Sequence, residues 1–167
     1  MAFNINVANS CKLLSLRAKR YDATSTQASI VFTDLETTAT YSTVMAYDNT
    51  GKGNLNVPVA NLPSANGVYK VCLSEGGIEY TCKPVLIKCN IDCCLTKLTN
   101  EIIDCSCDCP RCASALAKAQ KVFLLLESAA SAVEIAGVTQ SDAYFIDILE
   151  KYLKAKEICD NSCGCDC

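Results

Sequence analysis

Two dense groups of cysteine are the residues whose type and spacing point most directly to chemistry. Four lie within eight residues, and four more lie at the C-terminal end: Cys105, Cys107, Cys109, Cys112, Cys159, Cys163, Cys165 and Cys167. Cys-x-Cys and Cys-x-x-Cys spacing lets one turn of chain supply several thiolates, and soft sulfur ligands favour zinc or iron–sulfur over magnesium or calcium. Eight thiolates can hold two tetrahedral ions, so the sequence predicts a structural zinc centre.

Disulfide bonds are the alternative use of these eight cysteines. A disulfide between the two groups would close a loop of about 50 residues and stabilise the fold by roughly 4 kcal/mol in the chain-entropy model. We favour zinc because a direct disulfide within Cys-x-Cys is strained, and because small polar residues such as Ser106, Asp108 and Gly164 suit a chelating turn. Neither group has the spacing of ferredoxin iron–sulfur ligands. Reduced thiols are the third alternative.

The sequence argues against an enzyme. The chain contains no histidine, which excludes Ser-His-Asp and Cys-His catalysis and the usual mixed catalytic zinc sites. Cys109-Pro110-Arg111-Cys112 has the Cys-x-x-Cys form of a redox motif at a helix start. However, the alternating strands and helices of a thioredoxin-like fold do not surround it. We therefore predict a non-catalytic protein.

The remaining six of the fourteen cysteines receive structural interpretations. Cys72 and Cys82 flank a Gly76-Gly77 turn, and we expect them to face each other across a hairpin as packed thiols, with a disulfide as the alternative. Because the chain starts without a basic segment and an apolar run, we expect folding in a cytoplasm with reduced thiols. Cys89, Cys93 and Cys94 lie at the start of the first predicted helix, where we expect packing at the domain junction, with a second small site shared with the sandwich as the alternative. Cys11 has no partner by spacing.

Residues 1–88 have the pattern of strands. Segments rich in Val, Thr, Tyr and Ile alternate with turn residues, which predicts about six or seven strands. Those located are 30–32, 41–47, 55–59, 68–73 and 78–87. Pro58 places its strand at a sheet edge, and Glu75-Gly76-Gly77 marks a hairpin. The segment from Leu62 to Tyr69 resembles the tyrosine corner of immunoglobulin-like and fibronectin-like sandwiches, with an ordinary loop as the alternative. We expect an immunoglobulin-like β-sandwich domain over 1–88.

Residues 89–167 change to the period of helices. Three apolar stripes advance in steps of three and four: Ile91, Leu95, Leu98, Ile102; Leu116, Ala119, Phe123, Leu126, Ala130, Val133; and Phe145, Ile148, Tyr152, Ala155. A loop of about four residues between the second and third stripes makes those helices antiparallel neighbours. The predicted fold class is therefore α+β with two domains: the sandwich, then an up-down-up three-helix bundle. Chain direction brings both cysteine groups to one end of that bundle as a terminal cluster.

The C-terminal half resembles a known class of viral protein. Residues 89–99, 105–112 and 118–129 together are similar to a cysteine-rich module in virion neck and tail proteins of crAss-like and related tailed bacteriophages of Bacteroidota. The resemblance covers roughly residues 80–167. It implies a structural neck or tail ring or adaptor subunit, present in several copies and bound to portal, ring or tail subunits. It also implies a location in the virion, after assembly in the host cytoplasm.

Charge and hydropathy set further limits on partners. The net charge is −3, and the short basic run at 17–20 reads as a solvated face, so we expect no direct binding of nucleic acid. No apolar run reaches the roughly 18 residues of a membrane span, so we expect no membrane association. The alternative function is a cytoplasmic zinc-binding interaction or regulatory module. A redox or metal-storage protein is the third.

Overall fold

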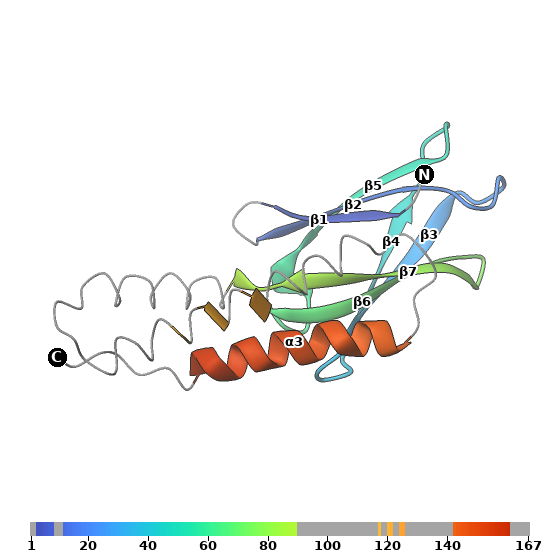
Figure 1. Ribbon diagram of the computed structural model, residues 1–167. Helices are drawn as coiled ribbons and strands as arrows, with labels where there is room; N and C mark the ends of the chain where they lie inside the picture. The colour runs from blue at the N-terminus through green and yellow to red at the C-terminus, as the bar shows by residue number, and fades with distance from the viewer. Residues whose placement is uncertain are drawn as a thin grey trace.

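The part of the chain that the structure describes is mostly β-sheet. The computed structural model describes residues 3–8, 12–89 and 142–160, with five isolated positions at 117, 120, 121, 124 and 125. Seven strands form two antiparallel sheets in this part of the chain, and one helix lies against them (Figure 1).

A three-stranded sheet faces a four-stranded sheet. The smaller sheet has the order β1-β2-β5, with β1 at Asn4–Ala8, β2 at Leu13–Lys19 and β5 at Lys52–Pro58. The larger sheet has the order β4-β3-β6-β7, with β4 at Thr40–Ala46, β3 at Gln27–Asp34, β6 at Gly67–Glu75 and β7 at Ile78–Ile87. A 3-10 turn, η1 (Val59–Asn61), follows β5. β5 is an edge strand, as Pro58 predicted.

The core lies between the two sheets. Along β2 and β3 buried and more exposed residues alternate, which is the period of strands with one face turned inward. Leu14 and Leu16 of β2 are fully buried, as are Ile30 and Phe32 of β3. Burial of a side chain of this size contributes about 1.5–3 kcal/mol, so this layer is the main driving force of the sandwich.

The tyrosine corner predicted from sequence is present. The Tyr69 hydroxyl donates to the Ser64 carbonyl oxygen at 2.6 Å and accepts from the Ser64 backbone N–H at 2.8 Å. Tyr69 is fully buried at the start of β6, so one phenol fixes the loop that enters this strand. The alternative of an ordinary loop is wrong.

The hairpin between β6 and β7 is also present. Glu75 pairs with Ile78, which leaves Gly76 and Gly77 as a two-residue connection with φ of 56° and 81°. Two successive positive φ values are typical of the type I′ turn that matches strand twist, and glycine adopts them without steric cost. The ladder contains one irregularity, a register shift between Leu73 and Ser74.

Helix α3 (Asp142–Asp160) packs on the outer face of the four-stranded sheet (Figure 1). Its buried residues Ile148, Tyr152 and Ala155 form one apolar cluster with Val68 of β6. Near the start of the helix, the Lys70 ammonium lies 5.2 Å from the centre of the Phe145 ring. Helix α3 therefore packs on the face of β6 that is turned away from the sandwich core. Among the described residues, no helix has the length and apolar composition needed to cross a membrane.

The predicted fold class, α+β with a three-helix bundle, is wrong for the described residues. They form two sheets and α3, the one helix whose bounds the structure describes, and the stripe of α3 contacts the sandwich. The third stripe predicted the buried face of this helix, since Phe145, Ile148 and Ala155 are buried. A helical period shows which face is covered but does not identify what covers it. Leu35 and Leu86 of the sandwich half supply part of the covering surface that we assigned to other helices.

Candidate functional site

The predicted zinc ligands lie mostly outside the described residues. This holds for Cys105, Cys107, Cys109, Cys112, Cys163, Cys165 and Cys167. Cys159 belongs to the backbone of α3, and its side chain is not described. The zinc centre over these eight cysteines therefore stays a prediction.

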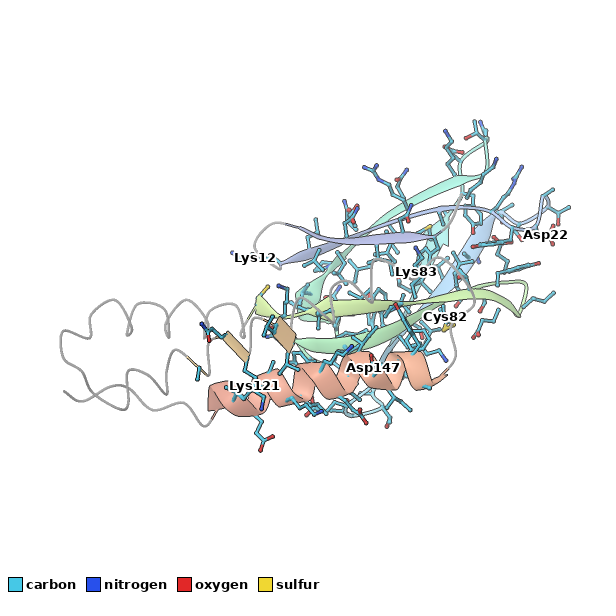
Figure 2. All side chains as sticks on the ribbon, in the orientation of Figure 1. Lys12, Asp22, Cys82, Lys83, Lys121 and Asp147 are labelled. Atoms are coloured by element: carbon cyan, nitrogen blue, oxygen red, sulfur yellow. A yellow bond between two sulfur atoms is a disulfide. The ribbon has the colours of Figure 1, made fainter. Side chains whose placement is uncertain are left out.

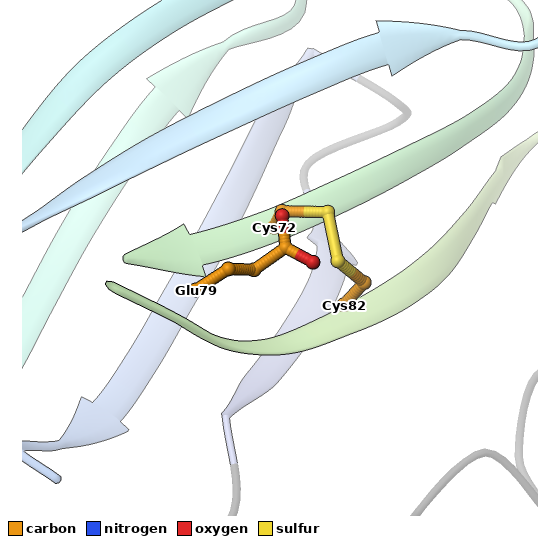
Figure 3. Close-up of side chains that lie close together, drawn as sticks. All are labelled: Cys72, Glu79 and Cys82. Atoms are coloured by element: carbon orange, nitrogen blue, oxygen red, sulfur yellow. A yellow bond between two sulfur atoms is a disulfide. The ribbon is translucent and has the colours of Figure 1, made fainter. Parts of the chain in front are cut away.

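A different sulfur site is described on the β6–β7 hairpin. Cys72 and Cys82 are joined by a disulfide, with their Cα atoms 4.0 Å apart (Figure 3). They are direct register partners in the antiparallel ladder, a position that brings opposed Cβ atoms close together. The expectation of two packed, reduced thiols is wrong. Cys89 is also disulfide-bonded, so the expectation of reduced thiols fails there too.

A carboxylate lies beside the two sulfur atoms because the pairing of β6 with β7 is irregular. Without the shift, Glu79 would lie three residues from Cys82 and point to the opposite face of β7. The register shift pairs Glu79 with Ser74, two residues from Cys72, and so turns Glu79 onto the cysteines' face. The Cys72 and Cys82 sulfurs and a Glu79 carboxylate oxygen all lie within 4.8 Å of one another (Figure 3).

This group lies on the outer face of the larger sheet, beyond the part that α3 covers. Val68, Lys70 and Cys72 occupy every second position of β6 and so lie on the same face of the sheet. Val68 and Lys70 contact the helix. Cys72 and Cys82 are partly exposed, and Glu79 is exposed. Figure 2 shows Cys82 on its strand of the larger sheet. The three residues are therefore accessible to solvent and dissolved ions.

A second polar cluster lies where the hairpin meets the 20–26 loop. Glu75 is 3% exposed, and its carboxylate accepts from the Tyr21 N–H at 2.9 Å, the Asp22 N–H at 2.8 Å and the Tyr47 hydroxyl at 2.6 Å. Burial by itself raises the pKa of Glu75. The hydrogen bonds from the Tyr47 hydroxyl and from the Tyr21 and Asp22 backbone lower it by more, so the pKa lies below its ordinary 4.5. Burial and the adjacent carboxylate raise the pKa of Tyr47. Glu75 is therefore an anion that holds a loop.

Asp34 has a similar role at the end of β3. It is 2% exposed, and its Oδ1 accepts from the backbone N–H groups of Glu36 at 2.9 Å and Thr37 at 3.3 Å. Its carbonyl oxygen accepts from the Thr38 N–H at 2.7 Å, and Thr38 has a φ of 64°. Asp34 thus stabilises a tight turn between β3 and β4.

Sequence alone predicts no role for Glu79 or Asp34, and it marks Glu75 only as part of the Glu75-Gly76-Gly77 hairpin turn. Glu79 gave no signal, because strict alternation along β7 puts it on the wrong face. Only the register shift brings it beside Cys72 and Cys82.

Comparison with known proteins assigns no family. No family model matches the chain, and no curated protein matches it. Among solved structures, the catalytic module of the multi-modular glycogen-degrading pneumococcal virulence factor SpuA, in complex with an inhibitor, shares 12% identity at a TM-score of 0.37. The match covers 50% of this chain and 12% of that one. A similarity at this level defines neither the fold nor the function of the chain.

Proposed function

We propose that the chain is a non-catalytic structural subunit, specifically a neck or tail ring or adaptor protein of a tailed bacteriophage virion. The observation that carries the structural role is the attachment of α3 to the sandwich. Ile148, Tyr152 and Ala155 share one buried cluster with Val68, so helix α3 and the β-sheet half form a continuous body. A subunit that transmits load between neighbours needs such a connection.

The use of the buried acids supports this role. Glu75 and Asp34 each receive backbone N–H donors from a loop or turn. A catalytic carboxylate usually needs an accessible oxygen and a pKa moved toward the working pH. The hydrogen bonds of Glu75 instead hold its pKa low, with burial opposing them. These two groups are therefore suited to fixing loops at the sandwich ends.

The virion assignment rests on the resemblance of residues 80–167 to neck and tail proteins of crAss-like phages. Two observations agree with it. Disulfides such as Cys72–Cys82 persist on virion surfaces, which meet an oxidising medium outside the host. A β-sandwich with a docked helix also offers several faces to neighbours, as a ring or adaptor subunit needs.

The test is the mass of the purified full chain as a function of concentration, by light scattering and native mass spectrometry. A ring subunit is expected to form a closed homo-oligomer of several copies. Electron microscopy of the same sample should show rings. A chain that stays a monomer at every concentration and carries bound zinc would contradict the ring role and favour a zinc-binding interaction or regulatory module.

A further inference from the structure

We propose that Cys72, Cys82 and Glu79 form a redox-gated binding site for a zinc-class divalent cation, which is open when the Cys72–Cys82 disulfide is reduced. The inference concerns the hairpin alone. It depends neither on the proposed virion role nor on the eight cysteines of the C-terminal half.

The donor set has the chemistry of such a site. Two thiolates and one carboxylate are ligands that zinc takes, and a water can complete four-coordination. Bond lengths of about 2.3 Å to sulfur at a tetrahedral angle put the two sulfurs about 3.8 Å apart. Cys72 and Cys82 are directly opposed with Cα atoms 4.0 Å apart, so side-chain rotation alone can supply this separation. The Glu79 oxygen already lies within 4.8 Å of both sulfurs.

The strand frame does not need the disulfide, so the site can open without unfolding. β6 is paired on both sides, with β3 from Ser29 to Asp34 and with β7 along its length. The Gly76-Gly77 turn fixes the hairpin independently. The frame that places the three ligands therefore persists after the sulfur–sulfur bond is broken.

The register shift adds a specific observation. A disulfide needs only the opposed pair Cys72 and Cys82, and a regular ladder would supply it. The shift between Leu73 and Ser74 has no part in that bond, yet it moves Glu79 onto the cysteines' face. Bulges of this kind re-aim side chains beside functional sites. Two thiolates, one carboxylate and a divalent cation sum to a charge of −1, and Lys70 is the next residue along this face of β6.

The opening step balances as a thiol–disulfide exchange. A dithiol reductant gives two electrons and two protons to Cys72–Cys82 and becomes a disulfide itself, leaving two thiols on the hairpin. Zinc then binds the two sulfurs as thiolates and releases two protons. Oxidation by a disulfide-class oxidant reverses the exchange and expels the ion.

The test compares zinc binding by the full chain before and after reduction with a phosphine. The variants are the double replacement C72S/C82S, the single replacement E79Q, and E150Q as a control on an exposed carboxylate of α3. Native mass spectrometry counts the ions. Because the other cysteines are common to all variants, the difference between wild type and C72S/C82S reports on the hairpin alone.

We expect the reduced wild type to hold one more zinc than reduced C72S/C82S, and no such difference between the oxidised wild type and C72S/C82S. Loss of an outer-shell partner weakens metal binding about 10–100-fold. Loss of the Glu79 ligand in E79Q should therefore cost at least about tenfold in affinity at this site, with E150Q unchanged. Zinc should also slow alkylation of Cys72 and Cys82 in the reduced chain, as read by peptide mass mapping.

Equal zinc counts in reduced wild type and C72S/C82S would overturn the site. If C72S/C82S fails to fold, the alkylation measurement decides, because it uses the wild type and E79Q, which keep both cysteines. Unprotected Cys72 and Cys82 in the presence of zinc would overturn the proposal. Equal protection in wild type and E79Q would remove Glu79 from the ligand set and so overturn the site as stated.

Discussion

At the scale of single residues, the Tyr69 phenol fixes the connection into β6. Its hydroxyl makes two hydrogen bonds with the backbone of Ser64, as donor and as acceptor. The replacement Tyr69→Phe keeps the ring but leaves both Ser64 groups without this partner. Leaving such polar groups without a hydrogen-bond partner costs about 1–3 kcal/mol, so the free energy of unfolding should fall by this amount. Urea denaturation followed by circular dichroism measures the change.

Tyr80→Phe is the matched control for Tyr69→Phe. Tyr80 is 37% exposed and stacks on Tyr21 at 4.9 Å between ring centres, so its ring packing survives the loss of the hydroxyl. We expect this variant to unfold within about 0.5 kcal/mol of wild type, as is usual for surface changes. Equal unfolding of the two variants would mean that the Tyr69 hydrogen bonds carry no net stability.

Glu75 makes stability depend on pH in a defined direction. Burial raises the pKa of Glu75, but the hydrogen bonds donated by Tyr47, Tyr21 and Asp22 lower it by more. Folding therefore lowers this pKa below 4.5. A carboxyl group with a lowered folded pKa adds stability above its unfolded pKa, and this stability is lost as pH falls through the folded value. Glu75→Gln should therefore cost about 1.5–3 kcal/mol at neutral pH, the range for hydrogen bonds to a charged group.

The difference between wild type and Glu75→Gln should shrink as the pH falls below the ordinary pKa of 4.5, because the carboxyl of the unfolded chain is then protonated before that of the folded chain. Urea unfolding at a series of pH values checks this. Glu79→Gln, at an exposed carboxylate of the same hairpin, is the control and should show no comparable loss at neutral pH. A constant difference across the series would contradict the role of the Glu75 charge.

Residue-level prediction from sequence worked where the signal was local. The segment from Leu62 to Tyr69 carries the spacing of a tyrosine corner within eight residues, and the hydrogen bonds follow it. Glu79 could not be found this way. Its position beside Cys72 and Cys82 depends on a register shift between two strands, which is a property of their pairing and leaves no mark in either strand alone.

At the scale of elements, the attachment of α3 is the contact most open to test. Ile148 is fully buried in the cluster with Val68, whereas Ile146 on the same helix is 51% exposed. Ile148→Ala should cost about 2–5 kcal/mol, from lost burial and the cavity left behind. Ile146→Ala should change stability by less than about 0.5 kcal/mol. Denaturant unfolding of both variants measures the contrast.

Hydrogen exchange locates the effect of Ile148→Ala. If α3 detaches from the sheet, amides of the helix should lose protection while the inner strands β2 and β3 keep theirs. Similar losses in Ile146→Ala and Ile148→Ala would contradict the helix face observed here. Uniform loss over all strands would show that the helix and the sandwich unfold as one unit.

The same helix shows the limit of element prediction. Its buried face was predicted from the stripe of Phe145, Ile148, Tyr152 and Ala155, and the observed bounds Asp142–Asp160 enclose that stripe. The partner was predicted wrongly, because an apolar stripe fits a neighbouring helix or a sheet face equally well. The missing information was that Val68, Lys70 and Cys72 of β6 lie on the sheet face opposite the sandwich core. It requires knowing which face of β6 points away from the core.

At the scale of the whole molecule, the β-sandwich could be predicted from sequence more completely than the surface on which α3 packs. The edge position of Pro58 and the Gly76-Gly77 hairpin are local signals, and both were correct. Strands β1 (Asn4–Ala8) and β2 (Leu13–Lys19) could not be located from sequence, because neither segment is a run rich in β-branched and aromatic residues. Their pairing supplies the second sheet, with Leu14 and Leu16 filling the core.

The last prediction concerns the cysteine-rich half. If the groups at 105–112 and 159–167 brace that half together, Cys112→Ser should lower the melting temperature more than Cys11→Ser, because Cys11 belongs to neither group. Equal melting temperatures would refute the brace. The chemistry can then be separated by limited proteolysis of the C-terminal tail in the C72S/C82S background, which removes the hairpin disulfide from the comparison. A zinc brace should loosen with a strong chelator and resist a phosphine, whereas a disulfide brace should show the opposite pattern.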